Sequence, residues 1–156
     1  MLDVYARLKS DLGTRRESYL GGHRDPTGRM WMTRLRSGRH GLAVNTGRFK
    51  RPKPRREERW CEWCEEFCDR KVVEDERHVF FKCPRYALER GQMLNELGLD
   101  VGMGNDGSFD ALNLLLGAGP GVQVESDEER KKRHVQVQRF LRRVLHMRIK
   151  EGEVKR

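Results

Sequence analysis

Three cysteines and one histidine occur in this chain at a spacing that is typical of a metal site. They are Cys61, Cys64, His78 and Cys83, in the pattern Cys-x2-Cys-x13-His-x4-Cys. The first pair can bend around one ion, and the second pair can return from a separate segment to complete a tetrahedron. Because four protein ligands leave no open position for a water molecule, the sequence predicts one structural zinc ion per chain and no Lewis-acid chemistry.

Cys68 leaves the ligand set open at one position. It lies four residues after Cys64, so its sulfur could replace the His78 imidazole or could be a bystander on the same loop. The spacing between His78 and Cys83 is common in zinc knuckles, which favours His78 and leaves Cys68 as the spare thiol. Disulfide bonds are the alternative use of four cysteines, but we see no secretory segment ahead of them and expect zinc binding instead.

Charge is distributed unevenly along the chain. The net charge is +9 at pH 7, with residues 1–60 and 128–156 strongly basic and residues 61–127 acidic. Such a distribution suggests that the two ends meet a polyanion, although a solvated, charge-rich surface would look the same. Arginine outnumbers lysine, and its planar guanidinium suits phosphate, so nucleic acid is the expected partner.

The densest basic segment, residues 48–59, leads into the first cysteine pair. Pro52 and Pro54 cannot continue a helix or a strand, so we expect this segment to be extended and exposed. It could follow a phosphate backbone, act as a nuclear import signal, or be only a solvated linker. Its candidate phosphate contacts are Arg48, Lys50, Arg51, Lys53, Arg55, Arg56 and Arg59.

Hydrophobic spacing predicts a mainly α fold. Helices are expected at residues 2–12, about 28–36, 84–97 and 109–116, each followed closely by a glycine. Residues 71–73 could form a short strand. A capping box at Ser126 and Glu129 should open a long C-terminal helix that reaches about Lys150.

The C-terminal helix has an apolar stripe and a basic remainder. We expect the stripe to pack on the core, because so polar a chain needs the buried area; docking on a partner is the alternative. The stripe consists of Val137, Phe140, Leu141, Val144 and Met147. Further candidate phosphate contacts on this helix are Arg130, Lys131, Arg133, Arg142 and Arg143.

Several polar residues are interpreted as non-catalytic. Glu74, Asp75 and Glu76 are neighbours on one loop that point different ways, and no second carboxylate group is placed to share a metal with them. His40 has no cysteine near it in sequence and is expected in a polar loop. His134 and His146 are expected to be exposed.

Composition predicts one small domain with a thin core. Hydrophobic residues make up 36% of the chain and charged residues 37%, so a metal ion would contribute materially to stability. No run of 18 apolar residues occurs, and we expect a soluble, intracellular protein of the nucleus or cytoplasm, without a membrane partner. The expected parts are a helical region at 1–47, a basic linker at 48–60, a zinc unit at 61–125, the C-terminal helix at 126–150 and a tail at 151–156.

Around these residues the chain resembles the C-terminal zinc-binding (CCHC) region of reverse transcriptases from non-LTR (LINE-type) retrotransposons. That family combines the cysteine and histidine pattern with Leu-Arg-x-Gly, Gly-Arg, an acidic run and Cys-Pro-x-Tyr-x3-Arg. The matching residues here are Leu35, Arg36, Gly38, Leu42, Gly47, Arg48, Arg59, Cys61, Cys64, Glu74, His78, Cys83, Pro84, Tyr86 and Arg90. A looser likeness continues through residues 109–117 and 139–141.

The resemblance implies nucleic-acid binding, since this region of the family is thought to grip template RNA or target DNA for the polymerase. The polymerase and nuclease domains of such elements are not in this sequence. The expected function is therefore a zinc-dependent module that binds RNA or DNA without catalysis of its own, with a reverse transcriptase or host protein as a further partner. One rival is a protein-interaction adaptor that binds through the C-terminal helix. Another is a His-metal nuclease, which would need a general-base histidine that the motif lacks.

Overall fold

The computed structural model describes residues 25–100, 102, 109–116 and 126–154, and this part of the chain is mainly helical, as expected. The helices are α2 (Pro26–Arg36), α3 (Ala43–Thr46), α4 (Glu62–Cys68), α5 (Ala87–Leu97), α6 (Phe109–Leu116) and α7 (Asp127–Val154). Short 3-10 turns form at Gly47–Phe49, Arg56–Glu58 and Pro84–Tyr86, and a π-helical turn at His78–Lys82. The helix expected at residues 2–12 lies outside the described residues.

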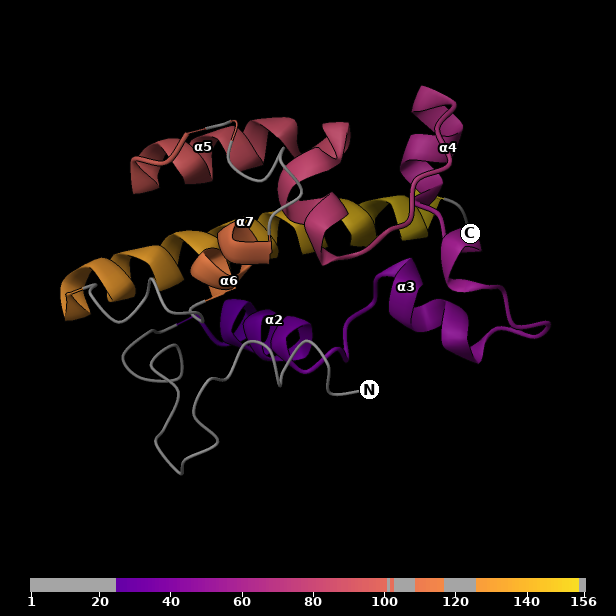
Figure 1. The fold of residues 1–156 in the computed structure, drawn as a ribbon, viewed down its shortest axis with the longest axis horizontal. Helices are drawn as coiled ribbons and strands as arrows, with labels where there is room; N and C mark the ends of the chain where they lie inside the picture. The colour runs from indigo at the N-terminus through magenta and orange to yellow at the C-terminus, as the bar shows by residue number, and fades with distance from the viewer. Residues whose placement is uncertain (1–24, 101, 103–108, 117–125, 155–156) are drawn as a thin grey trace.

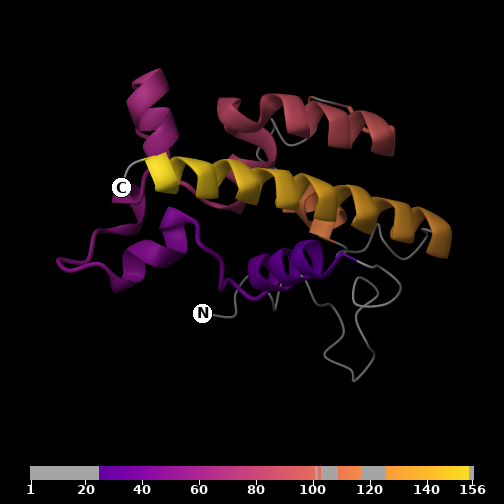
Figure 2. The same ribbon diagram turned by 180° about the vertical axis from the view of Figure 1, so that it is seen from behind.

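Helix α7 is the axis of the fold. It runs along the long dimension of the molecule with α2 against one side and α5 against another (Figures 1 and 2), and α6 also contacts it. Four residues of its apolar stripe are buried and Met147 packs against the same core. The stripe therefore serves the core, as expected, and is not available as a docking face for a partner. The helix continues past Lys150 to Val154.

Local capping explains where two of the helices begin. Asp25 caps α2 by accepting a hydrogen bond at Oδ1 from the Gly28 N–H (3.0 Å), and Pro26 takes the first helical position. The predicted capping box before α7 is present. The Ser126 N–H donates to Glu129 Oε2 (2.9 Å), and the Glu129 N–H donates to Ser126 Oγ (3.2 Å).

Helix α2 crosses α7 closely at Gly28. A methyl group there would lie 2.6 Å from Gln138 Cβ and 3.2 Å from its Cα, so alanine would force the helices apart. We expect Gly28→Ala to lower the free energy of unfolding by about 1–3 kcal/mol, measured by urea denaturation. Gly91→Ala in α5 is the control: no atom lies within 4 Å there, and alanine should raise stability by about 0.5–1 kcal/mol. Equal stability of Gly28→Ala and the parent would contradict the close crossing.

Polar side chains enter the core of this helical bundle. Arg36 is 1% exposed, and its guanidinium donates to the carbonyl of Leu116 at the end of α6. Arg133 and His134 are buried in α7, whereas His146 is exposed, so the expectation for His134 was wrong. The reason is that α2, α5 and α6 all contact α7, and a helix covered on several sides buries more positions than its apolar stripe.

Candidate metal centre

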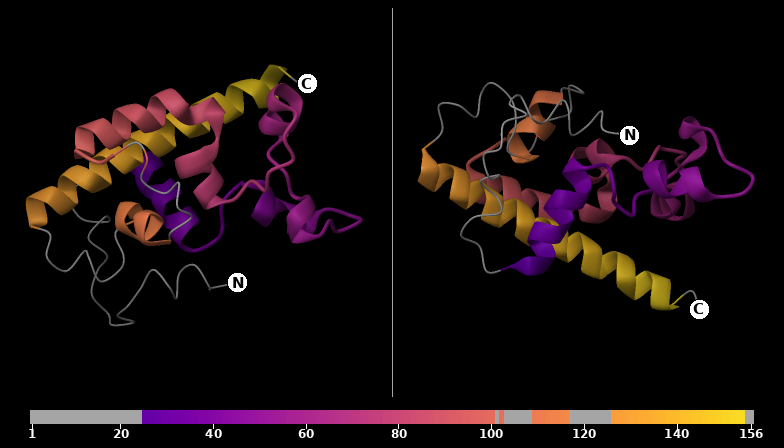
Figure 3. Two further views of the ribbon diagram at one scale, coloured as in Figure 1. Left: turned by 45° about the horizontal axis from the view of Figure 1, so that its top comes forward. Right: turned by 90° about the horizontal axis from the view of Figure 1, so that it is seen from below.

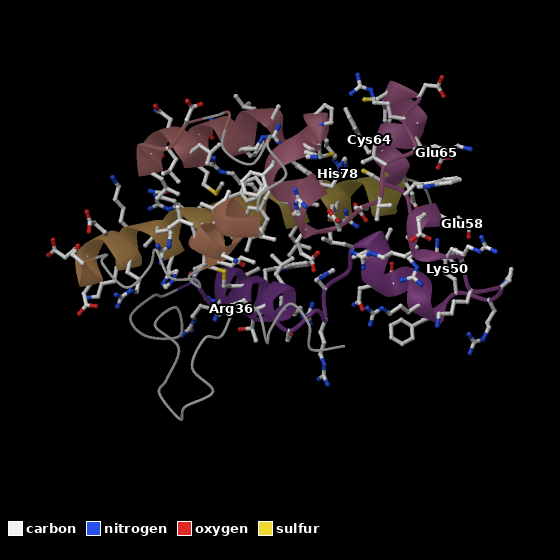
Figure 4. The ribbon with its side chains drawn as sticks, in the orientation of Figure 1. Arg36, Lys50, Glu58, Cys64, Glu65 and His78 are labelled. Atoms are coloured by element: carbon white, nitrogen blue, oxygen red, sulfur yellow. The ribbon has the colours of Figure 1, made fainter. Side chains whose placement is uncertain are left out.

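The structure brings Cys61, Cys64, His78 and Cys83 together, and all four are buried. Their ligand atoms lie within 4.8 Å of one another. Cys64 Sγ is 3.4 Å from His78 Nε2 and 3.8 Å from Cys83 Sγ; Figure 4 labels Cys64 and His78. All four cysteines of the chain are free thiols, so the disulfide alternative is wrong. Four such donors can hold one metal ion.

Each ligand lies at the edge of a short helical element. Cys61 is the N-cap of α4, and Cys64 lies within its first turn. His78 opens the π-helical turn, and the Cys83 N–H closes it by donating to the His78 carbonyl (2.7 Å). Asp69, at φ 50°, ends α4 in the left-handed region and turns the chain back. Short elements thus aim all four donors at one point.

Backbone pairing holds the first cysteine against the returning chain. The Cys61 N–H donates to the Val72 carbonyl (2.8 Å), and Trp60 and Val73 form an isolated antiparallel bridge. The strand expected at residues 71–73 is reduced to this bridge, because the opposing segment becomes helix α4 at Glu62.

Proximity couples the charges of the three thiols. Hydrogen bonding from Cys83, aided by His78 and opposed by burial, lowers the pKa of the Cys61 thiol to about 3. Burial, together with the Cys61 charge, raises the pKa of Cys64 to about 11. The hydrogen bond that Cys83 donates to Cys61, together with burial, raises the Cys83 pKa as well. One thiolate therefore forms readily, and the other two thiols resist ionisation, partly because the negative charge of Cys61 would repel theirs. A bound cation would remove this repulsion.

Cys68 lies outside the cluster. It ends α4, one turn beyond Cys64, and is half-buried. The structure therefore places His78, and not Cys68, among the four donors. An α4 longer than one turn was not expected from the sequence.

Alanine substitution should separate the four donors from Cys68. We expect Cys64→Ala and His78→Ala to reduce the metal content from about one ion per chain to a small fraction, because three remaining donors do not close the site. Cys68→Ala should retain the full content, as measured by elemental analysis of the purified variants. Retained metal in His78→Ala together with loss in Cys68→Ala would reverse the assignment.

The carboxylates of the acidic run before His78 form hydrogen bonds within the protein. Glu74 accepts hydrogen bonds from the Ala43 N–H (2.7 Å) and from the guanidinium of Arg148. Asp75 Oδ1 accepts from the His78 N–H (2.9 Å) and so positions the ligand segment. These contacts agree with the interpretation that the run is structural.

His40 is the partner of the third acidic residue and is buried at 3% exposure. Its Nε2 donates to Glu76 Oε1 (2.7 Å), while Nδ1 accepts from the Leu42 N–H (3.3 Å). Burial alone would raise the pKa of the Glu76 carboxyl, but the hydrogen bond from His40 holds it below its usual value. His40 lies in the loop between α2 and α3, as expected, and it is buried there because the buried Glu76 carboxylate needs a donor.

The metal centre and α7 form one core. Phe80, in the turn that begins at His78, packs on Phe140 of α7 with ring centroids 5.3 Å apart. Arg85 donates to the Met147 carbonyl (2.8 Å). Arg148 forms an ion pair with Glu74, and the two residues are so far apart in sequence that no local spacing indicates the pair. Sequence reasoning missed this pair.

The basic segment is exposed at its centre and anchored at its end. It leaves the body of the molecule as a loop (Figure 1), with a 3-10 turn on each side rather than a fully extended course. Arg48 is half-buried. The exposed cations are Lys50, Arg51, Lys53, Arg55 and Arg56, at residues 50–56, which we call the basic loop.

Arg59 is a buried anchor and not a surface contact. Its Nη1 donates to the Val44 carbonyl (2.7 Å) and its Nη2 to the Pro54 carbonyl (3.2 Å). A methyl group on Gly47 would lie 2.7 Å from Arg59 Cδ, so the glycine makes room for this side chain. The candidate contact at Arg59 is therefore withdrawn, because its guanidinium is occupied inside the protein.

The cations of α7 form a second, separate patch. Lys131, Arg142 and Arg143 are exposed, Arg130 pairs with Asp127 (2.8 Å), and Arg133 is buried and withdrawn as a contact. The first half of α7 and the basic loop lie toward opposite ends of the molecule (Figures 1 and 3). The cations of the first half of α7 and those of the basic loop, which were both expected to meet a polyanion, therefore do not share one surface.

No protein-family model matches the chain, and no curated protein or solved structure matches it significantly. Among the described residues, no helix is both long enough and apolar enough to cross a membrane. Many residues that carry the likeness to the retrotransposon proteins have structural roles here. Arg36 reaches α6, Gly47 accommodates Arg59, and Arg90 donates to the Cys83 carbonyl (3.0 Å).

Proposed function

We propose that the four-residue cluster holds one structural zinc ion. Zinc bonds of about 2.3 Å to sulfur and 2.0–2.1 Å to nitrogen give tetrahedron edges of about 3.8 Å between sulfurs and 3.5–3.6 Å between sulfur and nitrogen. The distances from Cys64 are 3.8 Å to Cys83 Sγ and 3.4 Å to His78 Nε2. Three thiolates and one imidazole suit zinc, and the closed site leaves no position for an activated water. The ion would hold the fold together and would supply no Lewis-acid chemistry of its own.

We further propose that the zinc-loaded protein binds RNA or DNA through the basic loop. The observation that carries this proposal is the density of exposed charge: five exposed cations lie within residues 50–56. Arg59 and the Glu58 carboxylate, which accepts from the Arg55 N–H (2.7 Å), hold the end of the loop. A positioned row of cations can meet successive phosphates without losing much conformational freedom.

Recognition of this kind should depend little on base sequence. Phosphate contacts carry no sequence information, and Phe49 is the only aromatic residue between Arg48 and Arg59. The second patch on α7 could touch a longer nucleic acid at a separate point. The resemblance to the retrotransposon region supports the same partner class.

Salt dependence tests the proposal. Affinity for labelled oligonucleotides of unrelated sequence, measured by fluorescence anisotropy between about 50 and 200 mM salt, should fall steeply. If three or four cations each meet a phosphate, log affinity against log salt should have a slope of about −2 to −4, shallower for single strands. A strong preference for one sequence, or binding independent of salt, would contradict phosphate recognition.

A further inference from the structure

A groove of about 400 Å³ lies between α3, the basic segment and the start of α4. Two indoles, Trp60 and Trp63, line it together with five carboxylates, those of Glu58, Glu62, Glu65, Glu66 and Glu74. Figure 4 shows Lys50, Glu58 and Glu65 at this end of the molecule. Neither the metal site nor the proposed phosphate contacts account for these indoles and carboxylates.

The positive charges inside the groove are already engaged. Arg148 binds Glu74 and the Gly41 carbonyl (3.1 Å), and Arg59 donates to two carbonyls as described above. Arg85 donates to the Met147 carbonyl (2.8 Å). The guanidinium groups of these three arginines therefore serve the fold through internal hydrogen bonds.

The negative charges at the rim are available. Glu62 and Glu65 are exposed and form no ion pair with any residue that the structure describes. Glu58 accepts only a backbone hydrogen bond, from Arg55. Among the described residues, Lys50 is the one exposed cation that lines the groove. The free charge of the groove is therefore negative, which repels phosphate and attracts a cation.

The indoles suit a cationic side chain. Trp60 already has an ammonium group against it, with Lys71 Nζ 4.4 Å from its ring centroid. Trp63 packs on Phe67 with centroids 5.3 Å apart, and Phe67 is itself 63% exposed. Aromatic faces beside carboxylates bind ammonium and guanidinium groups through cation–π and charge attraction together. Apolar stems of lysine or arginine would cover the exposed rings.

We propose that this groove docks a lysine- or arginine-rich segment of a partner protein. One cationic side chain enters beside the indoles, and its charge meets the Glu62 and Glu65 carboxylates. The docking site adjoins the basic loop, which contributes Lys50 and Pro54 to its lining, but the free charge of the groove has the opposite sign to that of the loop. It does not depend on whether the chain binds nucleic acid.

A peptide titration tests the proposal with the full zinc-loaded chain. The probe is a fluorescently labelled peptide of alternating arginine and glycine, and the reference peptide has glutamine at each arginine. We expect the first peptide to bind and the second not to. The double variant Glu62→Gln with Glu65→Gln should weaken binding about tenfold, because two exposed ion pairs are lost. Trp63→Leu should also weaken it, at unchanged metal content.

The control is the double variant Glu96→Gln with Glu128→Gln, which changes net charge equally at exposed positions outside the groove. Its peptide affinity should match the parent. Equal weakening in both double variants would overturn the proposal, since net charge alone would then explain binding. Loss of oligonucleotide affinity in the Glu62 and Glu65 variant would assign the groove to nucleic acid. Loss of a dimer by the same variant in sedimentation would assign the groove to a second copy of the chain. Either result would also overturn the proposal.

Discussion

Removal of zinc by a chelator is expected to unfold the protein. Structural zinc contributes about 10–16 kcal/mol at pH 7 in small domains, which is comparable with the whole stability of a typical domain, about 5–15 kcal/mol. Cys61, Cys64 and Cys83 belong to the same buried cluster as the apolar residues of α2, α5, α6 and α7, so loss of the ion should propagate through the core. Far-UV circular dichroism during chelation should show loss of most of the helical signal, and added zinc should restore it.

Cys68→Ala is the matched control for this experiment, because it removes a thiol and leaves the four donors intact. Its helical signal should fall at the same chelator concentration as that of the parent. If elemental analysis showed the metal to be gone while the helical signal stayed unchanged, the ion would not be needed for the fold.

Neutralising four cations of the basic loop should have the largest effect on nucleic-acid affinity. The variant changes Arg51, Lys53, Arg55 and Arg56 together to glutamine. All four side chains are exposed, and the only ion pair that they form with the described residues is a 4.0 Å contact of Arg56 with Asp75, so the fold should persist. Affinity should fall about 10- to 100-fold at 0.1 M salt for every sequence tested, and the salt slope should flatten. Some binding should survive through α7.

The control is a second quadruple variant that loses the same four positive charges at positions outside the basic loop. It changes Arg39, Arg70, Lys82 and Lys132 to glutamine, all of them exposed and outside the proposed contacts. Its salt slope should stay close to that of the parent. Equal flattening in both quadruple variants would show that net charge, and not the basic loop, determines binding.

The elements that could be predicted from the sequence are those whose cause is local. Pro84 and Gly98 delimit the region of α5, Ser126 and Glu129 open α7, and cysteine spacing locates the cluster. Each depends on residues a few positions apart, so the pattern is visible in the chain itself.

The features that were missed involve side chains whose partners are distant in sequence. His40 is buried because Glu76 is buried beside it, and Arg59 is inside because Gly47 leaves room and Val44 offers a carbonyl. Charge counting placed Arg59 on the surface, since a charged side chain is usually exposed. Only the folded structure shows which guanidinium groups form their hydrogen bonds inside the protein.

X-ray absorption at the zinc edge of the purified full chain tests the central claim most directly. The claim is that Cys61, Cys64, His78 and Cys83 close one tetrahedral site around which the chain folds. The expected spectrum has three sulfur neighbours at about 2.3 Å and one nitrogen at about 2.0–2.1 Å, with no oxygen neighbour. Four sulfur neighbours would show that Cys68 is a ligand in place of His78, and an oxygen neighbour would indicate an open site. Either result would contradict a closed centre made by Cys61, Cys64, His78 and Cys83.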